Sequence, residues 1–96
     1  MSQVTIGGNV IYDIINEDVD SSTWKKIEIP SGGSCFSILA RLRDGNSFKI
    51  SHLPDGSRYL TVDGMLSLDI GKSSGETLFY VQTSSTSTTL EVLLLE

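Results

Sequence analysis

Cysteine and histidine are both scarce in this sequence of 96 residues, which contains only Cys35 and His52. A single thiol cannot close a disulfide within the chain, so a disulfide-stabilised secreted scaffold is excluded. The usual zinc sites need several His, Cys or acidic ligands at recognisable spacings, and the sequence has no such set. We interpret Cys35 as a half-buried apolar residue of a strand. We interpret His52 as a turn residue at a strand end, because no carboxylate or nucleophile is obviously placed to act with it.

Positive charge and long apolar segments are also missing. The formal net charge is −5, and the seven Lys and Arg residues are scattered along the chain, whereas nucleic-acid contacts need clustered basic residues. No segment approaches the roughly 20 apolar residues of a membrane-spanning helix. The N-terminus has neither the basic start nor the apolar stretch of a signal peptide. We therefore expect no nucleic-acid partner, no membrane partner, and folding in a reducing cytoplasm.

Helical periodicity is lacking too, because no stretch of about ten residues repeats its apolar positions every three or four residues. β-Branched and aromatic residues instead fill short apolar runs, which Gly, Pro, Asp and Asn separate at short intervals. This pattern predicts strands throughout the chain. The candidate strands are residues 3–6, 9–15, 24–29, 34–43, 47–51, 58–62, 65–70, 77–83 and 88–96.

About eight short strands joined by tight turns predict a single all-β domain over residues 1–96. The fold that we expect is a small two-sheet antiparallel β-sandwich with a jelly-roll-like topology. An up-and-down barrel or an immunoglobulin-like sandwich would give a similar pattern, so the strand order stays open. The segment "DGN" at 44–46 predicts a hairpin, because Asp-Gly and Gly-Asn tolerate positive φ. Gly56 in "LPDGS" and the pair Asp63–Gly64 predict two further turns.

Neither HExxH nor a phosphate-binding glycine loop is present in the sequence. The acidic segment "NEDVD" at 16–20 offers oxygen ligands of the kind that calcium prefers. It lacks the glycine and the ligand order of an EF-hand, however, and we interpret it as a solvated polar loop. Spacing selects no glycosidase-like pair among the twelve acidic residues. We therefore expect a non-enzymatic protein without a cofactor or a metal.

Trp24 allows two interpretations, and both stay open at this stage. It can begin its strand and fold over the end of the sandwich as part of the core. Alternatively, strict alternation places Ile27 and Ile29 inside, so that Trp24 shares the outward face with Lys26 and contacts a partner or a sugar ring. A sugar platform would need a second exposed and coplanar ring. The candidates for that ring are Tyr12, Tyr59 and Tyr80.

The chain closes on "TTLEVLLLE", residues 88–96, which is apolar on both sides of an extended strand. If its even-numbered residues fill the core, Leu93 and Leu95 point outward, as Leu39 does on its own strand. Exposed apolar patches usually mark interaction sites. The alternative is that a loop of the same chain, residues 13–23, covers this side. The interface that we predict consists of Leu39, Leu93, Leu95 and Trp24, with Arg41 and Arg43 as charges at the rim.

Three stretches resemble the small β-sandwich accessory proteins of tailed-bacteriophage virions: "WKKIEIPSGGSCFSILARLRDGNSFKIS", "YLTV" and "TLFYVQTSSTSTTLEVLLLE". In those proteins a W-x-x-I-x-I-P strand precedes an Arg-bearing strand. An aromatic L-F/Y-V-Q strand then leads through a Ser/Thr-rich turn to a closing x-L-E-V strand. The similarity covers most of residues 24–96. It implies a structural role as a capsid decoration, cement or head-fibre-base protein, or as a small tail or neck component.

The resemblance also implies a homo-oligomer, often a trimer, that binds at a symmetry axis of the shell, and it brings no catalytic residues to this sequence. We therefore expect a virion protein that is made in the host cytoplasm. Its expected partners are copies of itself and the phage major capsid protein or another virion protein. The alternative hypothesis is a carbohydrate-binding β-sandwich module with a glycan as its partner.

Overall fold

The computed structural model describes residues 5–6, 9–29, 37–69, 77–84 and 87–95. Every candidate strand predicted from the sequence has a counterpart there, which confirms the all-β prediction. In this part of the chain no helix is long and apolar enough to cross a membrane. The nine strands within these residues are β1 (Thr5–Ile6), β2 (Asn9–Val19), β3 (Lys25–Ile29), β4 (Ser37–Leu42), β5 (Phe48–Ser51), β6 (Leu60–Val62), β7 (Met65–Asp69), β8 (Thr77–Thr83) and β9 (Thr88–Leu95).

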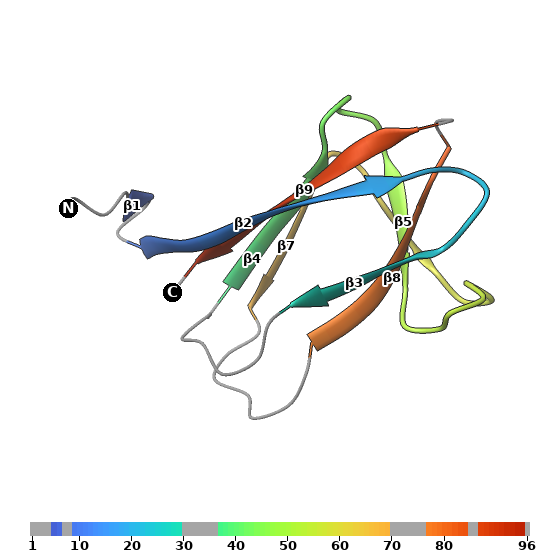
Figure 1. Cartoon of the computed structure of the whole chain (residues 1–96). Coiled ribbons are helices and arrows are strands. Elements are labelled where there is room, and N and C mark those ends of the chain that lie inside the picture. Colours follow the sequence, from blue (N-terminus) through green and yellow to red (C-terminus); the bar gives the residue numbers. More distant parts are fainter. Residues whose placement is uncertain (1–4, 7–8, 30–36, 70–76, 85–86, 96) are drawn as a thin grey trace.

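The strands form two antiparallel sheets that enclose one core (Figure 1). The larger sheet has the order β1-β2-β9-β4-β7, and the smaller has the order β3-β8-β5-β6. Without the two-residue β1, each sheet has four strands. β2 pairs with β9, β3 with β8, β4 with β7 and β5 with β6. The chain is therefore a long hairpin, with its tip between β5 and β6, that has rolled up into two layers. This is the topology of a jelly roll, so the predicted fold class is confirmed.

The core lies between the sheets and is centred on their inner strands. β9 contributes Leu90, Val92 and Leu94, which have no exposed surface, because β9 has a neighbouring strand on each side. β8 is equally central in the smaller sheet and buries Phe79 and Val81. Burial of each such side chain contributes about 1.5–3 kcal/mol, so these two strands supply much of the stability of the sandwich.

The predicted turns at Gly45, Gly56 and Gly64 are confirmed, because all three glycines have positive φ, at 79°, 66° and 81°. The hairpin predicted at 44–46 is nevertheless wrong. β4 pairs with β7 and β9, whereas β5 pairs with β6 and β8. The turn therefore carries the chain from one sheet to the other. A local turn signal fixes the reversal of the chain, but the burial of each strand's apolar face decides which strand becomes its neighbour.

The polar loop predicted at 16–20 is wrong over most of its length, because β2 continues through Val19 in register with β9. The turn begins at Asp20, whose Oδ1 accepts hydrogen bonds from the backbone amides of Ser22 and Thr23, at 3.0 Å each, and from both hydroxyls. These bonds, the Ser22 hydroxyl first, lower the pKa of Asp20. Within β2, alternation places Glu17 and Asp18 on opposite faces, so they do not form a calcium site together.

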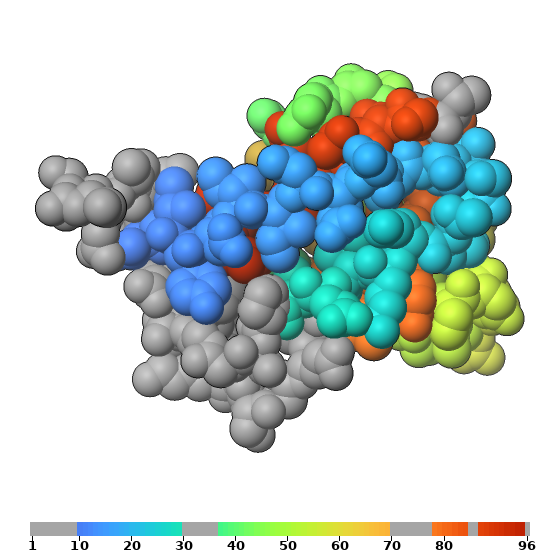
Figure 2. Space-filling model, in the orientation of Figure 1, coloured from blue at the N-terminus to red at the C-terminus, as the bar shows by residue number. Residues whose placement is uncertain are grey.

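The edge formed by β2 and β3 is closed. Glu17 lies on β2 in one sheet and Lys25 on β3 in the other, and Lys25 Nζ is 3.7 Å from Glu17 Oε2. The backbone amide of Thr83 also donates to the carbonyl of Asp20 at 3.1 Å, which ties β8 to the turn that follows β2. Figure 2 shows β2 and β3 side by side along this face of the molecule.

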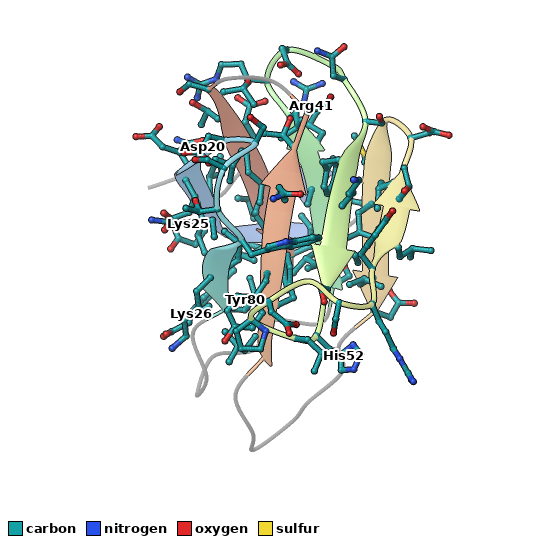
Figure 3. The ribbon with its side chains drawn as sticks, turned by 90° about the vertical axis from the view of Figure 1, so that its right-hand side faces the viewer. Asp20, Lys25, Lys26, Arg41, His52 and Tyr80 are labelled. Carbon is teal, nitrogen blue, oxygen red and sulfur yellow. The ribbon has the colours of Figure 1, made fainter. Side chains whose placement is uncertain are left out.

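The opposite edge, formed by β6 and β7, is open. Leu60 is opposite Ile50, and Leu68 is opposite the fully buried Ile38, so the register turns both leucines toward the interior. They are nevertheless 60% and 37% exposed. Figure 3 shows β6 and β7 along one side of the sandwich. The interior apolar layer is thus accessible from this side.

Candidate functional site

An apolar row crosses the outer face of the larger sheet. Ile14 on β2 is opposite Leu93 on β9, and Leu93 is opposite Leu39 on β4. Same-face neighbours on paired strands have Cβ atoms about 4.5–5.5 Å apart, so the three side chains form a continuous strip. Met65 on β7, opposite Arg41, extends it. Ile14 is 55% and Met65 51% exposed, while Leu39 and Leu93 are half-buried. We call Ile14, Leu39, Met65 and Leu93 the outer patch.

A carboxylate between two guanidinium groups borders the outer patch. Glu91 is opposite Arg41, and Arg41 Nε lies 3.1 Å from Glu91 Oε1. Arg43 lies two residues further along β4, and its Nε is 3.1 Å from Glu91 Oε2. The hydrogen bond from Arg43, followed by that from Arg41, lowers the pKa of Glu91. This cluster is cationic, although the whole chain carries −5. With the outer patch, Arg41 and Glu91 line a hollow of about 260 Å³.

Acid is expected to weaken the fold through three carboxylates. The pKa values of Asp20, Asp55 and Glu91 are all lowered by hydrogen bonds to the ionised form. Below about pH 4.3, where free carboxylates titrate, the unfolded chain binds more protons than the folded chain, so stability falls as the pH falls. The stabilisation of the fold by these carboxylates is fully present above their pKa in the unfolded chain, and it is lost as the pH drops through their lowered pKa in the folded chain.

Thermal unfolding followed by circular dichroism between about pH 7 and pH 3 measures this effect. Glu91→Gln removes one of the three carboxylates, so the variant should start with a lower Tm at neutral pH and lose less Tm on acidification. An acid-induced loss of Tm in Glu91→Gln as large as in the wild type would show that the pairing of Glu91 with the two arginines does not stabilise the fold.

The structure brings together four of the six predicted interface residues, Leu39, Leu93, Arg41 and Arg43. Leu95 is not one of them. It is 5% exposed, so the prediction that it lies on the exposed side is wrong. Leu95 is paired with Ile11 on one side and Ser37 on the other. The register of β2 shifts at this level, because Tyr12 is an additional residue. Such a bulge bends its strand, so strict alternation no longer predicts exposure here.

Trp24 is the other exception, because it precedes β3 in the smaller sheet. Its indole ring packs on Gly56 and lies 6.1 Å from the ring of Tyr59. Lys49 Nζ lies 4.6 Å from the centre of the Tyr59 ring. Trp24 is half-buried outside the core between the sheets, so it belongs neither to that core nor to a free surface. The two rings are tilted by 41°, so they do not form the coplanar platform expected for a sugar.

Sequence reasoning missed two members of the outer patch, Ile14 and Met65. Met65 could have been found, because alternation with the buried Leu66 places it on the outer side of β7. Ile14 could not, because the adjacent Ile15 is also apolar and only the pairing of residues 13–19 with β9 decides which of the two faces outward. Both residues are more than half exposed, and they enlarge the apolar surface that alternation alone had predicted.

The remaining candidates are not part of the outer patch. His52 follows β5 directly and is exposed, as predicted. Cys35 lies outside the described residues. Among the residues that are described, no group of three or more His, Cys, Asp or Glu is arranged to hold a metal ion. No protein-family model matches the chain, and neither a curated protein nor a solved structure shows significant similarity to it. Among the described features, the outer patch is therefore the strongest candidate for a contact with another protein.

Proposed function

We propose that this chain is a non-enzymatic structural protein that self-associates through the outer patch and serves as a decoration or cement protein on a bacteriophage capsid. The observation that carries the proposal is the outer patch itself. Its four apolar side chains come from four adjacent strands and share one solvent-facing side of the sheet. Contiguous apolar surface of this kind usually marks a contact with another protein.

A second copy of the chain is the occupant that best fits the outer patch. Full burial of a large apolar side chain contributes about 1.5–3 kcal/mol, and Ile14 and Met65 are about half exposed in the isolated chain. Further burial in two copies contributes several kcal/mol, which is comparable to the lower end of the association cost. In a cyclic trimer each outer patch meets a different surface of the next copy, and there the cationic cluster of Arg41, Arg43 and Glu91 favours acidic side chains, of which a chain with a net charge of −5 has an excess.

The virion role has two further supports. The jelly roll is a fold of viral capsid proteins and also of lectins, and a fold alone does not select among functions. The resemblance of most of residues 24–96 to phage accessory proteins favours the capsid.

In this proposal the oligomer is a trimer bound to the major capsid protein or another virion protein. Mass spectrometry of purified virions, with the copy number per particle, tests the proposal, and absence of the chain from the particles would refute the virion role.

Ile14→Asp is expected to convert the oligomer into a monomer. Ile14 is 55% exposed in the isolated chain, so the substitution places a charge in the interface without disturbing the core. Size-exclusion chromatography with light scattering measures the result. The wild type should have a mass that is a multiple of 10.4 kDa, three chains for a trimer, and the variant should have the mass of one chain.

Leu78→Asp is the matched control, because Leu78 is 38% exposed on the other sheet and this variant should remain oligomeric. Circular dichroism establishes that both variants are folded, and Ile14→Ser replaces Ile14→Asp if the latter is not. A wild-type protein that is monomeric at all concentrations would contradict the proposal. Equal dissociation of the Ile14 and Leu78 variants would show that the outer patch is not the interface.

A further inference from the structure

A second hollow, of about 400 Å³, lies where β5 ends and β6 begins. Its apolar lining comes from Ile50, Leu60 and Phe79. Ile50 and Leu60 are paired, and Ile50 is also opposite Val81, two residues from Phe79, so the three share the interior side of the smaller sheet. Leu60 is 60% exposed because β6 is an edge strand. The volume lies within the range of small-molecule sites, which are typically lined by apolar side chains with a few polar groups.

The loop over residues 52–59 supplies the polar groups of this hollow, and several contacts hold it in place. Ser51 is 5% exposed, and its hydroxyl donates to the carbonyl of Arg58 and accepts from the amide of Leu53 at 3.0 Å. One buried hydroxyl therefore joins both ends of the loop. The amide of Gly56 donates to the carbonyl of Leu53 at 3.1 Å, and Trp24 packs on Gly56. His52 and Arg58 both line the hollow. They thus lie on a segment whose conformation is held by hydrogen bonds and by the packing of Trp24.

The charge at this hollow is opposite to that of the whole protein. Arg58 and His52 are exposed, and neither forms an ion pair among the described residues. Asp55, an acidic residue of the same loop, accepts a hydrogen bond from the backbone amide of Ser57 at 3.0 Å. Figure 3 places His52 at the lower end of the sandwich and Arg41 at the upper end, so this hollow and the outer patch are separate sites. An unpaired guanidinium beside an apolar hollow is suited to a carboxylate on an apolar body.

We infer that this hollow binds a small apolar carboxylic acid. The body of the ligand packs against Ile50, Leu60 and Phe79, and its carboxylate accepts hydrogen bonds from Arg58, with His52 beside it. A neutral apolar ligand would make no ionic contact with Arg58, and a simple anion would leave the apolar surface exposed. The hollow is open to solvent, so a compact ligand such as a single aromatic ring with its carboxylate fits better than a long acyl chain. This inference is independent of the proposed self-association.

Phenylacetate is the probe that tests this site. Titration of the ¹⁵N-labelled full chain, followed by amide chemical shifts, should give saturable changes at Ile50–His52 and Arg58–Leu60, with a dissociation constant on the order of 1–10 mM. Two matched ligands test the apolar contact and the ionic contact separately. 2-Phenylethanol has the ring without the charge, and acetate has the charge without the ring. Both should bind at least about tenfold more weakly than phenylacetate.

Arg58→Gln should weaken phenylacetate binding about tenfold while leaving the weak binding of 2-phenylethanol unchanged. Lys26→Gln is the control, because Lys26 is an exposed cation on β3 that does not line the hollow. Leu60→Ala, at an exposed position, should weaken both aromatic ligands and is the second variant if Arg58→Gln does not fold. Absence of saturable shifts, equal binding of acetate, or equal loss in Arg58→Gln and Lys26→Gln would overturn the inference. None of these results depends on the oligomeric state.

Discussion

Gly56→Ala is expected to lower the free energy of unfolding by roughly 3 kcal/mol. Gly56 is buried and has a φ of +66°, a conformation that costs an L-residue about 1–2 kcal/mol. A Cβ atom here would also overlap the indole ring of Trp24, and overpacking of this kind costs about 1–3 kcal/mol. The two terms add, because the overlap is relieved only if Trp24 or the turn moves away from its position.

Gly45→Ala and Gly64→Ala are the matched controls for this effect. Both glycines have a similar φ, at +79° and +81°, but nothing lies within 4 Å of an added Cβ. They should therefore show only the backbone term of about 1–2 kcal/mol. Denaturant unfolding measures all three variants, and Trp24, the only tryptophan, reports on its own contact by fluorescence. The folded emission should shift in Gly56→Ala alone. Equal destabilisation of the three variants would show that the packing of Trp24 on Gly56 does not contribute.

The positions of the strands could be predicted from the sequence, because alternation and turn residues are local signals. The positive φ of Gly45, Gly56 and Gly64 was likewise foreseeable from their turn contexts. The pairing of the strands was not. The turn at Gly45 has the sequence of a hairpin, but β4 and β5 lie in different sheets. Local chemistry sets the reversal of the chain, whereas burial of the apolar faces over the whole domain sets the neighbours.

The candidate site shows the same division between local and long-range information. Leu39 and Leu93 were predicted to face outward from alternation alone, and the register places them opposite each other. Ile14 joins them because residues 13–19 of β2 pair regularly with β9, which places Ile14 opposite Leu93 and turns its apolar neighbour Ile15 toward the core. The bulge at Tyr12 changes the pairing on the other side, where Ile11 is opposite Leu95. Alternation therefore assigned a face where apolar and polar residues alternate, and it failed at adjacent apolar residues and next to the bulge.

The hollow at the end of β5 escaped sequence reasoning for a different reason. Ser51, His52 and Arg58 carry no motif, and the sequence predicts an ordinary turn in "LPDGS" followed by a strand over 58–62, whereas β6 begins at Leu60. The loop over 52–59 holds His52 and Arg58 in place through contacts with distant parts of the chain, above all the packing of Trp24 on Gly56. Likewise, Leu60 is exposed because, among the described strands, β6 has a neighbour on one side only. Strand order, which one sequence does not encode locally, decides which apolar residues are left uncovered.

Leu95→Asp is expected to prevent folding, in contrast to Ile14→Asp on the neighbouring strand. Leu95 is 5% exposed, and removal of a buried leucine side chain costs about 2–5 kcal/mol even when alanine replaces it. A buried carboxylate without a partner adds a further penalty. Together these terms approach the whole stability of a small domain, about 5–15 kcal/mol.

Circular dichroism and the dispersion of amide signals distinguish a folding defect from an assembly defect in Leu95→Asp. The milder Leu95→Ala should remain folded and oligomeric while losing about 2–4 kcal/mol of unfolding free energy. A folded, monomeric Leu95→Asp protein would have the opposite meaning. Leu95 would then face a partner, and the apolar row that begins at Ile14 would extend along β9 to its last residue. Leu93 and Leu95 lie two residues apart on β9. Because Leu93 belongs to the outer patch and Leu95 is buried within one chain, the predicted interface ends between them.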